Sequence, residues 1–374
     1  MHLYTRPWFL AALLVLLISC GAPSSPASNQ TTAPAAQGAE APAVSPFSTA
    51  TAISKPTATP EAVEPGASRS APLPLGTELR FTNWAVMISA VVRGDEAARA
   101  IANANQFNDP APPGWQYLLA TLKLTNISTE QTARSALLGV DVRVTGQRSL
   151  LYDRASVVPP RQLEGELFPG GSVEGQIAFL VPVDEGNLMF YVAEFLSFDR
   201  NGRRFVAIDE GAVVRPDSVL ATLTPTDTGA SRANPAPLGV TTISENWEIT
   251  VLEALRGIEA ARRVAEANMF NEPAPEGEEY LLARVRARYL GRDDPDVMAQ
   301  ISQSDFRATG AANVVYERPL VVAPEPRLDA YLFPGGQVEG WLVVQVPADE
   351  TGLTLVFQPG FALSDKNVRF FALE

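Results

Sequence analysis

The stretch FPGGSVEG at residues 168–175 recurs as FPGGQVEG at residues 333–340, and the two copies differ at a single position. Each copy begins with a turn in which two glycines supply backbone angles that other residues resist. An alternating apolar pattern, typical of a half-buried β-strand, follows each turn. The residues that we assign to the two turns on this basis are Phe168, Gly170, Gly171, Phe333, Gly335 and Gly336. The motif therefore predicts a turn leading into a strand, used twice by the chain.

The repeat extends well beyond this turn. Matching residues lie 163 positions apart near the start of each copy and 165 positions apart at the turn, so two single-residue insertions separate the copies. Insertions belong in loops, and both fall between expected strands. The matching pairs include Gly76/Gly239, Trp84/Trp247, Asn105/Asn268, Phe107/Phe270, Asn108/Asn271, Tyr117/Tyr280 and Phe168/Phe333. A unit of about 135 residues that occurs twice indicates a domain duplication, since solenoid repeats are several times shorter.

Alternating apolar residues predict many short strands in each unit. In the first unit we expect strands near residues 84–91, 117–126, 138–144, 150–157, 172–181, 188–192 and 203–208. An alanine-rich stretch at residues 95–107 has apolar residues at helical spacing, which predicts one short helix. Short strands separated by Gly/Pro turns are typical of an all-β sandwich. The sequence therefore predicts an all-β fold with two tandem sandwiches.

The order of these features resembles a family of immunoglobulin-like extracellular domains of unknown function. The features that carry the resemblance are Gly76, Trp84, Asn105-x-Phe107-Asn108, Gly114, Tyr117, a strand ending at Asn126, the turn at Phe168, and Val181-Pro182. Domains of this family occur on bacterial lipoproteins and are akin to a secreted mycobacterial immunoprotective antigen. The resemblance implies two tandem immunoglobulin-like β-sandwich domains in an exported protein, and it supplies no catalytic residues. The second unit departs from the family pattern at Tyr289, where the family has an Asn.

The first 19 residues are typical of a lipoprotein signal peptide. Arg6 precedes an apolar run that is too short to span a bilayer comfortably, and the run ends in Leu17-Ile18-Ser19-Cys20. These four residues resemble the bacterial lipobox, in which the Cys is diacylated and becomes the new N-terminus after cleavage. Because two acyl chains anchor a protein durably, we expect fatty acids such as palmitate on Cys20. The mature protein is then tethered to a membrane outside the cytoplasm.

Composition divides the rest of the chain. Up to residue 74, Ala, Pro, Ser and Thr dominate, and such a segment buries too little apolar surface to fold. The end of the connector between the two units has a similar composition, and we expect it to be flexible. The predicted parts are the signal peptide at 1–19, a disordered tether at 20–74, domains at 75–210 and 238–374, and the connector at 211–237.

The charge and the reactive side chains exclude several classes of function. The formal net charge of −13 repels phosphate backbones, which disfavours nucleic acid as a partner. The chain holds a single Cys, Cys20, and a single His, His2, and both precede the expected domains. Disulfides within the chain, Cys/His zinc sites and imidazole-based catalytic triads are therefore excluded. We expect neither a cofactor nor a metal.

Carboxylates remain as candidates for catalysis or calcium binding. The acidic groups are Glu164 and Glu166, Asp184-Glu185, Asp293-Asp294-x-Asp296 and Asp349-Glu350, with a further oxygen cluster at Asp199-x-Asn201-Gly202. Most of them lie in predicted turns, where acidic residues favour local hydrogen bonding and solvation. Neither oxygen cluster supplies a complete calcium loop. A turn role is favoured over a glycosidase-like or Ca²⁺-dependent site, which stays open as the alternative.

Four other residues are candidates for binding. Glu174 and Glu339 hold the same place in the two units, and we expect both to point to solvent. Trp115 and Trp341 have no aromatic counterpart in the other unit. An unpaired Trp is a candidate binding anchor, although core packing is the more common role.

A second shared motif, Asn-x-Phe-Asn, follows the expected helix in each unit and precedes a Pro-x-Pro turn. We expect the first Asn, Asn105 or Asn268, to close the helix in a left-handed conformation, and the Phe to fold back onto the sandwich. The residues that this interpretation makes structural are Phe107, Asn108, Phe270 and Asn271. No binding residue is assigned.

Together these patterns predict a membrane-anchored extracytoplasmic lipoprotein with a non-catalytic role, in binding or in presentation towards a protein or an envelope glycan. The alternative is a hydrolase with a carboxylate-based or Ca²⁺-dependent site. A third reading, the solute receptor of a transporter, is disfavoured because alternating strand and helix patterns are missing from the sequence.

Overall fold

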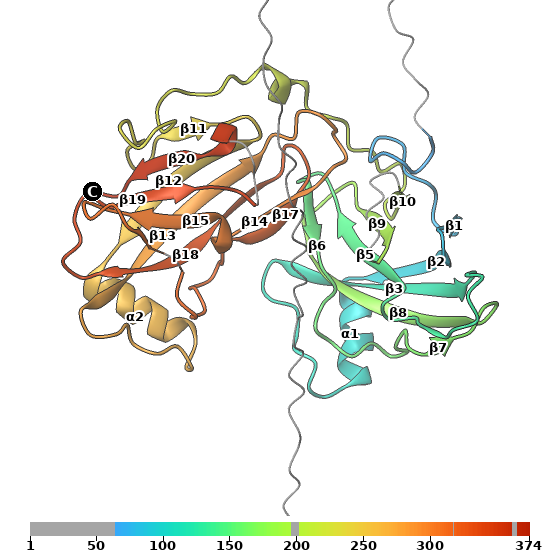
Figure 1. Ribbon diagram of the computed structural model, residues 1–374. Helices are drawn as coiled ribbons and strands as arrows, with labels where there is room; N and C mark the ends of the chain where they lie inside the picture. Colours follow the sequence, from blue (N-terminus) through green and yellow to red (C-terminus); the bar gives the residue numbers. More distant parts are fainter. Residues whose placement is uncertain (1–63, 196–201, 317, 361–364) are drawn as a thin grey trace, which may run out of the picture. The chain divides into compact units, whose positions relative to one another are not determined.

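The computed structural model describes residues 64–195, 202–316, 318–360 and 365–374. The regular structure of the described chain is mostly β-strand, with two short α-helices, α1 (Asp95–Ala104) and α2 (Gly257–Ala267), as Figure 1 shows. Its apolar residues gather in two main cores, one for each sequence repeat. The prediction of an all-β fold with short helices is confirmed, and the two cores agree with the expected duplication.

The first sandwich packs two antiparallel sheets around one core. One sheet, in the order β1-β2-β3-β8, consists of β1 (Glu78–Arg80), β2 (Trp84–Arg93), β3 (Trp115–Asn126) and β8 (Ser172–Pro182). The facing sheet contains, in order, β10 (Arg204–Ala207), β9 (Met189–Glu194), β5 (Val140–Thr145) and β6 (Leu150–Tyr152). Two short strands, β4 (Arg134–Ser135) and β7 (Glu166–Leu167), form a separate pair. The strand expected at residues 150–157 is shorter than predicted, because Ala155 already hydrogen-bonds to β8 of the opposite sheet.

The second sandwich repeats this arrangement. One sheet consists of β11 (Thr241–Ile243), β12 (Trp247–Leu255), β13 (Glu278–Tyr289) and β18 (Gln337–Pro347). The facing sheet contains β16 (Val315–Tyr316), β15 (Phe306–Thr309), β19 (Thr354–Phe357) and β20 (Arg369–Ala372). Even the irregularity of the second strand recurs, since the register shifts between Ile88 and Ala90 in β2 and between Val251 and Glu253 in β12. Three 3₁₀ turns complete the described elements: η1 (Ser218–Thr222), η2 (Gln303–Asp305) and η3 (Asp365–Asn367).

Each helix covers the outer face of a four-stranded sheet. Ala97 and Ile101 of α1 pack on Tyr117 and Leu119 of β3, and α2 packs on β13 in the same way. Successive residues of the long strands are therefore buried, some against the core and some against the helix. Their apolar runs are longer than simple alternation predicts. The helix expected at residues 95–107 ends at Ala104, since the next residue is already extended.

The glycines of the repeated turn have two different tasks. Gly170 and Gly335 have positive φ angles of 84° and 90°, so they supply the turn conformation expected from the sequence. Gly175 and Gly340, at the end of the motif, lie under a crossing segment. A Cβ at Gly340 would come within 2.5 Å of the backbone of Arg327, and one at Gly175 within 2.5 Å of Leu163. Both positions exclude a side chain because another backbone passes there.

Each repeat begins earlier than the sequence analysis placed it. Residues 64–74, expected in the disordered tether, are folded: Leu73 bridges to Val206 and Arg69 is buried. In the connector, expected to end as a flexible stretch, Ala236 pairs with Phe371 of β20 in the same way. Composition misled the prediction because a few specific contacts are enough to order a Pro-rich strap. The overlooked signal was the tetrapeptide GASR, which occurs at residues 66–69 and again at 229–232.

The facing sheet of the first sandwich continues into the second repeat. Strand β17 (Asp329–Leu332) pairs with β6, with Tyr331 opposite Leu151, and β14 (Ala299–Ser302) pairs with β17. The resulting six-stranded sheet has the order β10-β9-β5-β6-β17-β14. We call the contact between β6 and β17, with the side chains around it, the junction.

Phe333 is the centre of the junction. Its fully buried ring packs against Tyr191 and Phe205 of the first sandwich, with centroids 6.3 and 5.8 Å apart. The Arg69 guanidinium lies 4.2 Å from the Phe333 ring centroid, and its Nε donates to Asp296 Oδ1 at 3.1 Å. Removal of one partner of a buried ion pair is strongly destabilising, because it leaves the other charge buried without compensation.

Candidate functional site

Each helix is followed by a loop with the repeated sequence Asn-x-Phe-Asn, which we call the helix-end loop (residues 105–108 and 268–271). Its last Asn ties the loop to two neighbouring segments. Asn108 Nδ2 donates to the carbonyl oxygens of Ile101 and Val158 at 2.8 Å each, and Asn108 Oδ1 accepts from the Val158 amide at 2.8 Å. The Asn108 side chain thus satisfies a carbonyl group near the end of α1 and both backbone polar groups of Val158.

Asn271 makes the same three bonds in the second sandwich. Its Nδ2 donates to Val264 O at 2.7 Å and Val322 O at 2.9 Å, and its Oδ1 accepts from the Val322 amide at 2.9 Å. The repeated tyrosines hold the turn that follows, because Tyr117 and Tyr280 each donate to a backbone carbonyl eight residues earlier at 2.8 Å. Burial raises the pKa of both tyrosines, so their hydroxyl groups stay protonated donors.

The first Asn of the helix-end loop does not have the conformation predicted for it. Asn105 and Asn268 are extended, with φ angles of −154° and −157°, so the expected left-handed helix end is wrong. Instead, the side-chain oxygen of each accepts from the amide of the following Phe107 or Phe270 at 2.9 Å. This Asx turn bends the chain through the side chain and needs no positive φ.

The Phe of the helix-end loop is exposed, contrary to the expectation that it folds back onto the sandwich. Phe107 is 81% exposed and Phe270 is 82% exposed. Hydrogen bonds fix the Asn on either side, so the ring between them projects from the loop. Met269, next to Phe270, is also largely exposed. Each sandwich therefore holds one aromatic ring in solvent on a hydrogen-bonded loop, and the sequence gives no sign of this because an apolar residue between turn residues reads as core.

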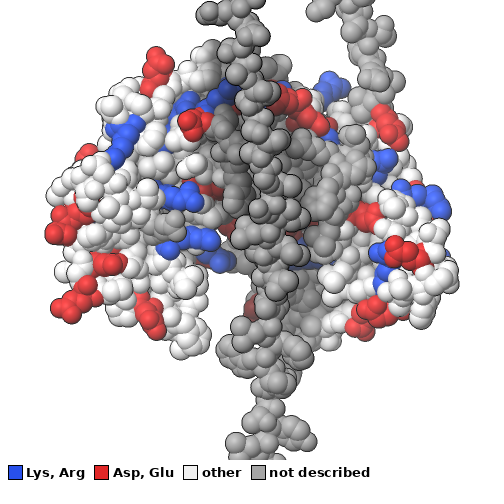
Figure 2. All heavy atoms as spheres, in the orientation of Figure 1, with Lys and Arg blue, Asp and Glu red and all other residues white. Residues whose placement is uncertain are grey.

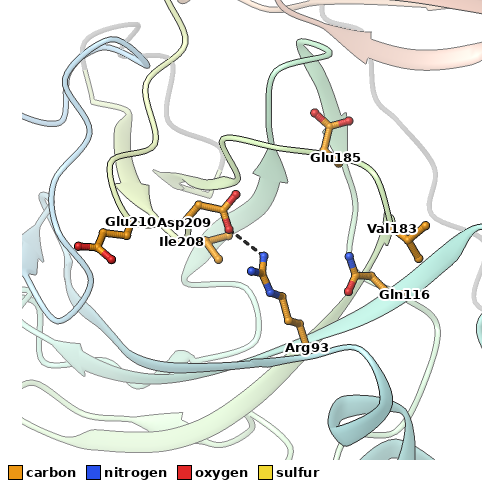
Figure 3. A pocket seen from close by; sticks show the side chains of 7 residues that line it. All are labelled: Arg93, Gln116, Val183, Glu185, Ile208, Asp209 and Glu210. Atoms are coloured by element: carbon orange, nitrogen blue, oxygen red, sulfur yellow. Dashed lines mark hydrogen bonds and ion pairs between the residues drawn. The ribbon is translucent and has the colours of Figure 1, made fainter.

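The first sandwich has a hollow of about 570 Å³ beside Arg93. Figure 3 shows the Arg93 guanidinium pointing at Asp209, with Glu185 and Glu210 set apart from this pair. Arg93 Nη1 pairs with Asp209 Oδ1 at 2.7 Å, and Asp209 Oδ2 accepts from the Leu188 amide at 2.9 Å. Both oxygens of Asp209 are therefore engaged in holding the end of β10 to its neighbours. The hollow offers a polar surface, lined by Arg93, Gln116, Val183, Glu185, Ile208, Asp209 and Glu210.

Glu185, the second acid of the pair Asp184-Glu185, has a structural environment. It is buried and accepts from the Tyr152 hydroxyl at 2.7 Å and from the Arg148 amide at 2.9 Å. Burial, together with this bond to Glu185, raises the pKa of Tyr152. Asp184 is exposed and pairs with Arg148 at 2.6 Å. The two carboxylates thus brace one loop and do not face a common cleft.

The pair Asp349-Glu350 repeats this arrangement. Glu350 is buried and accepts from the Tyr316 hydroxyl and, at 3.2 Å, from the Ala312 amide. The bond from Tyr316 lowers the pKa of Glu350 and keeps it ionised. The expectation of a turn role describes both pairs, with the addition that a Tyr from the neighbouring strand locks each turn.

The acidic cluster at residues 293–296 contributes to the junction. Asp296 is buried against Arg69, and Asp294 pairs with Arg203 at 3.0 Å while accepting from the Asp296 amide at 2.8 Å. Among the described residues, no three acidic side chains come together as a candidate metal site. The other oxygen cluster, Asp199-x-Asn201-Gly202, lies mostly outside the described residues.

The remaining candidates lie in ordinary surroundings. Glu174 is exposed and pairs with Arg161 at 2.7 Å, whereas Glu339 is half-buried between Arg284 and Arg286. Glu164 and Glu166 are both exposed, the latter in β7. Trp341 is buried beneath α2, with Arg263 stacked 5.1 Å from its ring, and Trp115 is 40% exposed and packs edge-on against Tyr152.

Figure 2 shows acidic and basic side chains interspersed over both sandwiches on the visible face. Much of this pattern is local pairing, as in Arg262, which pairs with Glu259 and Glu266 on α2. Cys20 lies outside the described residues, so the lipidation expected there stays a prediction. Within the described residues there is no helix with the length and apolar character to cross a membrane.

Comparisons with known proteins give weak matches to solved structures. A putative lipoprotein, ycdA, from Bacillus subtilis matches with a TM-score of 0.26 and 13% identity, over 36% of this chain and 38% of that chain. An uncharacterised β-sandwich protein from Clostridium difficile matches with a TM-score of 0.27 and 10% identity, over 40% of this chain and 100% of the other. The yjhA protein from Bacillus subtilis has a TM-score of 0.26 and 13% identity, over 37% of this chain and 99% of its own. No family model and no curated protein matches the sequence.

Proposed function

We propose that this protein is a lipid-anchored extracytoplasmic protein that binds an envelope component, a protein or a glycan, without catalysis. The observation that carries the proposal is the helix-end loop. Phe107 and Phe270 are held in solvent, at matching places in two sandwiches, by matching hydrogen bonds. Aromatic side chains are enriched among the residues that anchor binding interfaces.

The hydrogen bonds of the helix-end loop support binding because they restrict the positions that the loop can adopt. Asn108 and Asn271 each make three hydrogen bonds to the body of their domain, so the loop is preorganised. A loop whose backbone is already ordered loses little further entropy on contact with a partner. Aromatic rings serve both as hot spots at protein interfaces and as platforms for the apolar faces of ligands. Two such rings on one chain also permit bivalent attachment.

The anchor rests on the sequence. Cys20 ends a lipobox-like signal, and the resemblance to immunoglobulin-like extracellular lipoprotein domains, akin to the mycobacterial antigen, agrees with export. Residues 21–63 separate Cys20 from the described domains. A coil of that length reaches roughly 35 Å on average. The binding loops would thus operate at some distance from the lipid surface.

Three carboxylates line the hollow beside Arg93, and two of them, Asp209 and Glu185, give the hydrolase alternative no support. Asp209 is bound by Arg93 and a backbone amide, and Glu185 by Tyr152 and a backbone amide. A general acid needs a proton to give, and a nucleophile needs a free lone pair aimed at substrate. The carboxylate oxygens of Asp209 and Glu185 already accept hydrogen bonds from residues of the fold. We therefore favour a binding role.

The test is capture of envelope components with the full-length lipidated chain. We expect the double variant Phe107→Ala/Phe270→Ala to lose capture while its melting temperature stays within about 2 °C of the parent, since exposed rings contribute little to stability. Val219→Ala, which removes a different exposed apolar side chain, is the matched control and should capture normally. Full capture by the double variant would contradict the proposal.

A further inference from the structure

The two repeated turns have nearly the same sequence and very different surroundings. Phe333 is fully buried at the junction, whereas its counterpart Phe168 is 64% exposed. Phe333 also donates its amide to Ser149 O of the first sandwich at 2.8 Å. The first sandwich therefore carries the same turn, and the Phe168 ring at its start is exposed. Strand β7 precedes Phe168 as β17 precedes Phe333.

The strand edge that pairs with β17 at the junction, in β6, also has a counterpart in the second sandwich, and that counterpart is exposed. At the junction, Leu151 of β6 lies opposite Tyr331 and is 7% exposed. Its counterpart Val315, in β16, is 60% exposed. Within the described residues β16 pairs only with β15, and β7 only with β4. Unpaired strand edges of this kind are templates for another strand.

The buried arginine of the junction has a counterpart that is already in position. Arg69 Nη1 donates to Ser149 Oγ at 2.9 Å, and Arg232, 163 positions later, donates from Nη1 to Asn313 Oδ1 at 2.6 Å. Arg69 is buried under Phe333, whereas Arg232 is exposed. The second sandwich thus has the receiving surface assembled, without a turn seated on it among the described residues.

We propose that the chain associates head to tail with further copies of itself, with the junction as the template. The Phe168 turn of one copy packs on Val356 and Phe370 of the next copy. These two half-buried residues are the counterparts of Tyr191 and Phe205. A second copy is the occupant that fits, because the junction shows this turn and this strand edge already joined within one chain.

The register of the contact follows from the junction. Tyr331 pairs with Leu151 and Leu332 with Leu150. Their counterparts place Glu166 opposite Val315 and Leu167 opposite Val314 in the neighbouring copy. Val314, like Val315, is exposed in the single chain. Burial of two valines and a Phe supplies the apolar contribution to such a contact.

The proposed contact joins two different surfaces, so it is heterologous. Each added copy offers one new turn and one new strand edge, and assembly proceeds to a ring or an open filament. Chains anchored to one membrane would meet at a raised effective concentration. The proposal is independent of what the helix-end loops bind.

Disulfide capture between differently tagged full-length chains tests the register. Glu166→Cys in one chain and Val315→Cys in the other should give, under mild oxidation on membranes, a mixed dimer several-fold above the yield of either chain alone. Leu151→Cys/Tyr331→Cys in a single chain is the positive control, since these residues are paired at the junction. Val219→Cys mixed with Glu166→Cys is the negative control, because Val219 is exposed and lies in η1, outside both β7 and β16.

A mixed dimer no more abundant than the Val219→Cys control would overturn the proposal, and so would an equal yield from Glu166→Cys alone, which indicates a symmetric contact. Adding Phe168→Asp to the Glu166→Cys chain should lower the mixed yield at least fivefold. Because Phe168 is largely exposed, this change should leave the melting temperature of the unmixed chain unaltered. An undiminished yield contradicts the role of the turn.

Discussion

Phe270 and Asn271 are adjacent, repeated in the other unit, and different in role. Asn271 makes three hydrogen bonds through its side chain, whereas the side chain of Phe270 is largely exposed. The repeat itself predicted that both positions matter. It did not distinguish a side chain needed by the fold from one presented to a partner, because a single sequence carries no record of which way a loop residue points. The structure divides the motif into scaffold and exposed ring.

This division predicts unequal effects on stability. Asn271→Ala removes three hydrogen bonds and leaves the polar groups of Val322 without them, so it should lower the free energy of unfolding by about 1–3 kcal/mol. Phe270→Ala should change it by less than about 0.5 kcal/mol, because an exposed ring leaves no cavity. Urea denaturation of the two variants decides the matter, and a larger loss for Phe270→Ala would mean that the ring is buried in solution.

Cys20 is the other residue whose role can be tested alone. Cys20→Ser removes the only thiol of the chain and the acceptor for the acyl chains. We expect this variant to appear in the soluble fraction or as an unprocessed precursor, measured by fractionation and mass. Continued incorporation of labelled palmitate into the Ser variant would contradict the anchor.

At the scale of the elements, alternation of apolar residues predicted the long strands well. Strands β3 and β8 lie where the pattern placed them, since one face of each is core along its whole length. Short strands were predicted less well. Strand β17 covers only Asp329–Leu332 and pairs with β6, a partner that is distant in sequence. No local period identifies such a pairing, because it depends on where a separate sandwich places its edge.

The turn at the junction predicts a difference between two matched glycines. A Cβ at Gly336 would come within 2.4 Å of Ser149 O in the first sandwich, whereas a Cβ at Gly171 meets nothing closer than Phe168 O of its own turn, at 3.0 Å. Gly336→Ala should therefore lower the melting temperature clearly more than Gly171→Ala. Calorimetry of both variants at low protein concentration provides the comparison, and equal shifts would show that the junction is looser than described.

For the whole molecule, the sequence predicted two units and left their relation open. The described residues join the two sandwiches through a shared sheet, a buried Phe333 and the pair Arg69–Asp296. Arg69 lies in a segment that composition assigns to the tether. The junction could therefore not be predicted from composition. The connector between the sandwiches includes the exposed stretch around Arg215 and Pro216.

Limited proteolysis tests this relation. Cleavage should begin before residue 64, in the predicted tether, and continue in the connector near residues 215–225, to give two fragments of similar mass. Because of the junction, we expect the nicked fragments to elute together in size exclusion. Phe333→Ala, which empties the centre of the junction, should let them separate, whereas Phe168→Ala should not. Fragments that separate without any substitution would contradict the stability of the junction.

The central claim is that the exposed rings of the helix-end loops meet the partner. The most direct measurement replaces Phe107 or Phe270 by a photoreactive phenylalanine analogue in the full-length chain and irradiates intact cells. We expect covalent adducts with an envelope component from both positions, and none from the same analogue at Val219, which is also exposed. Adducts that form equally well at Val219, or that form at neither loop, would contradict the account.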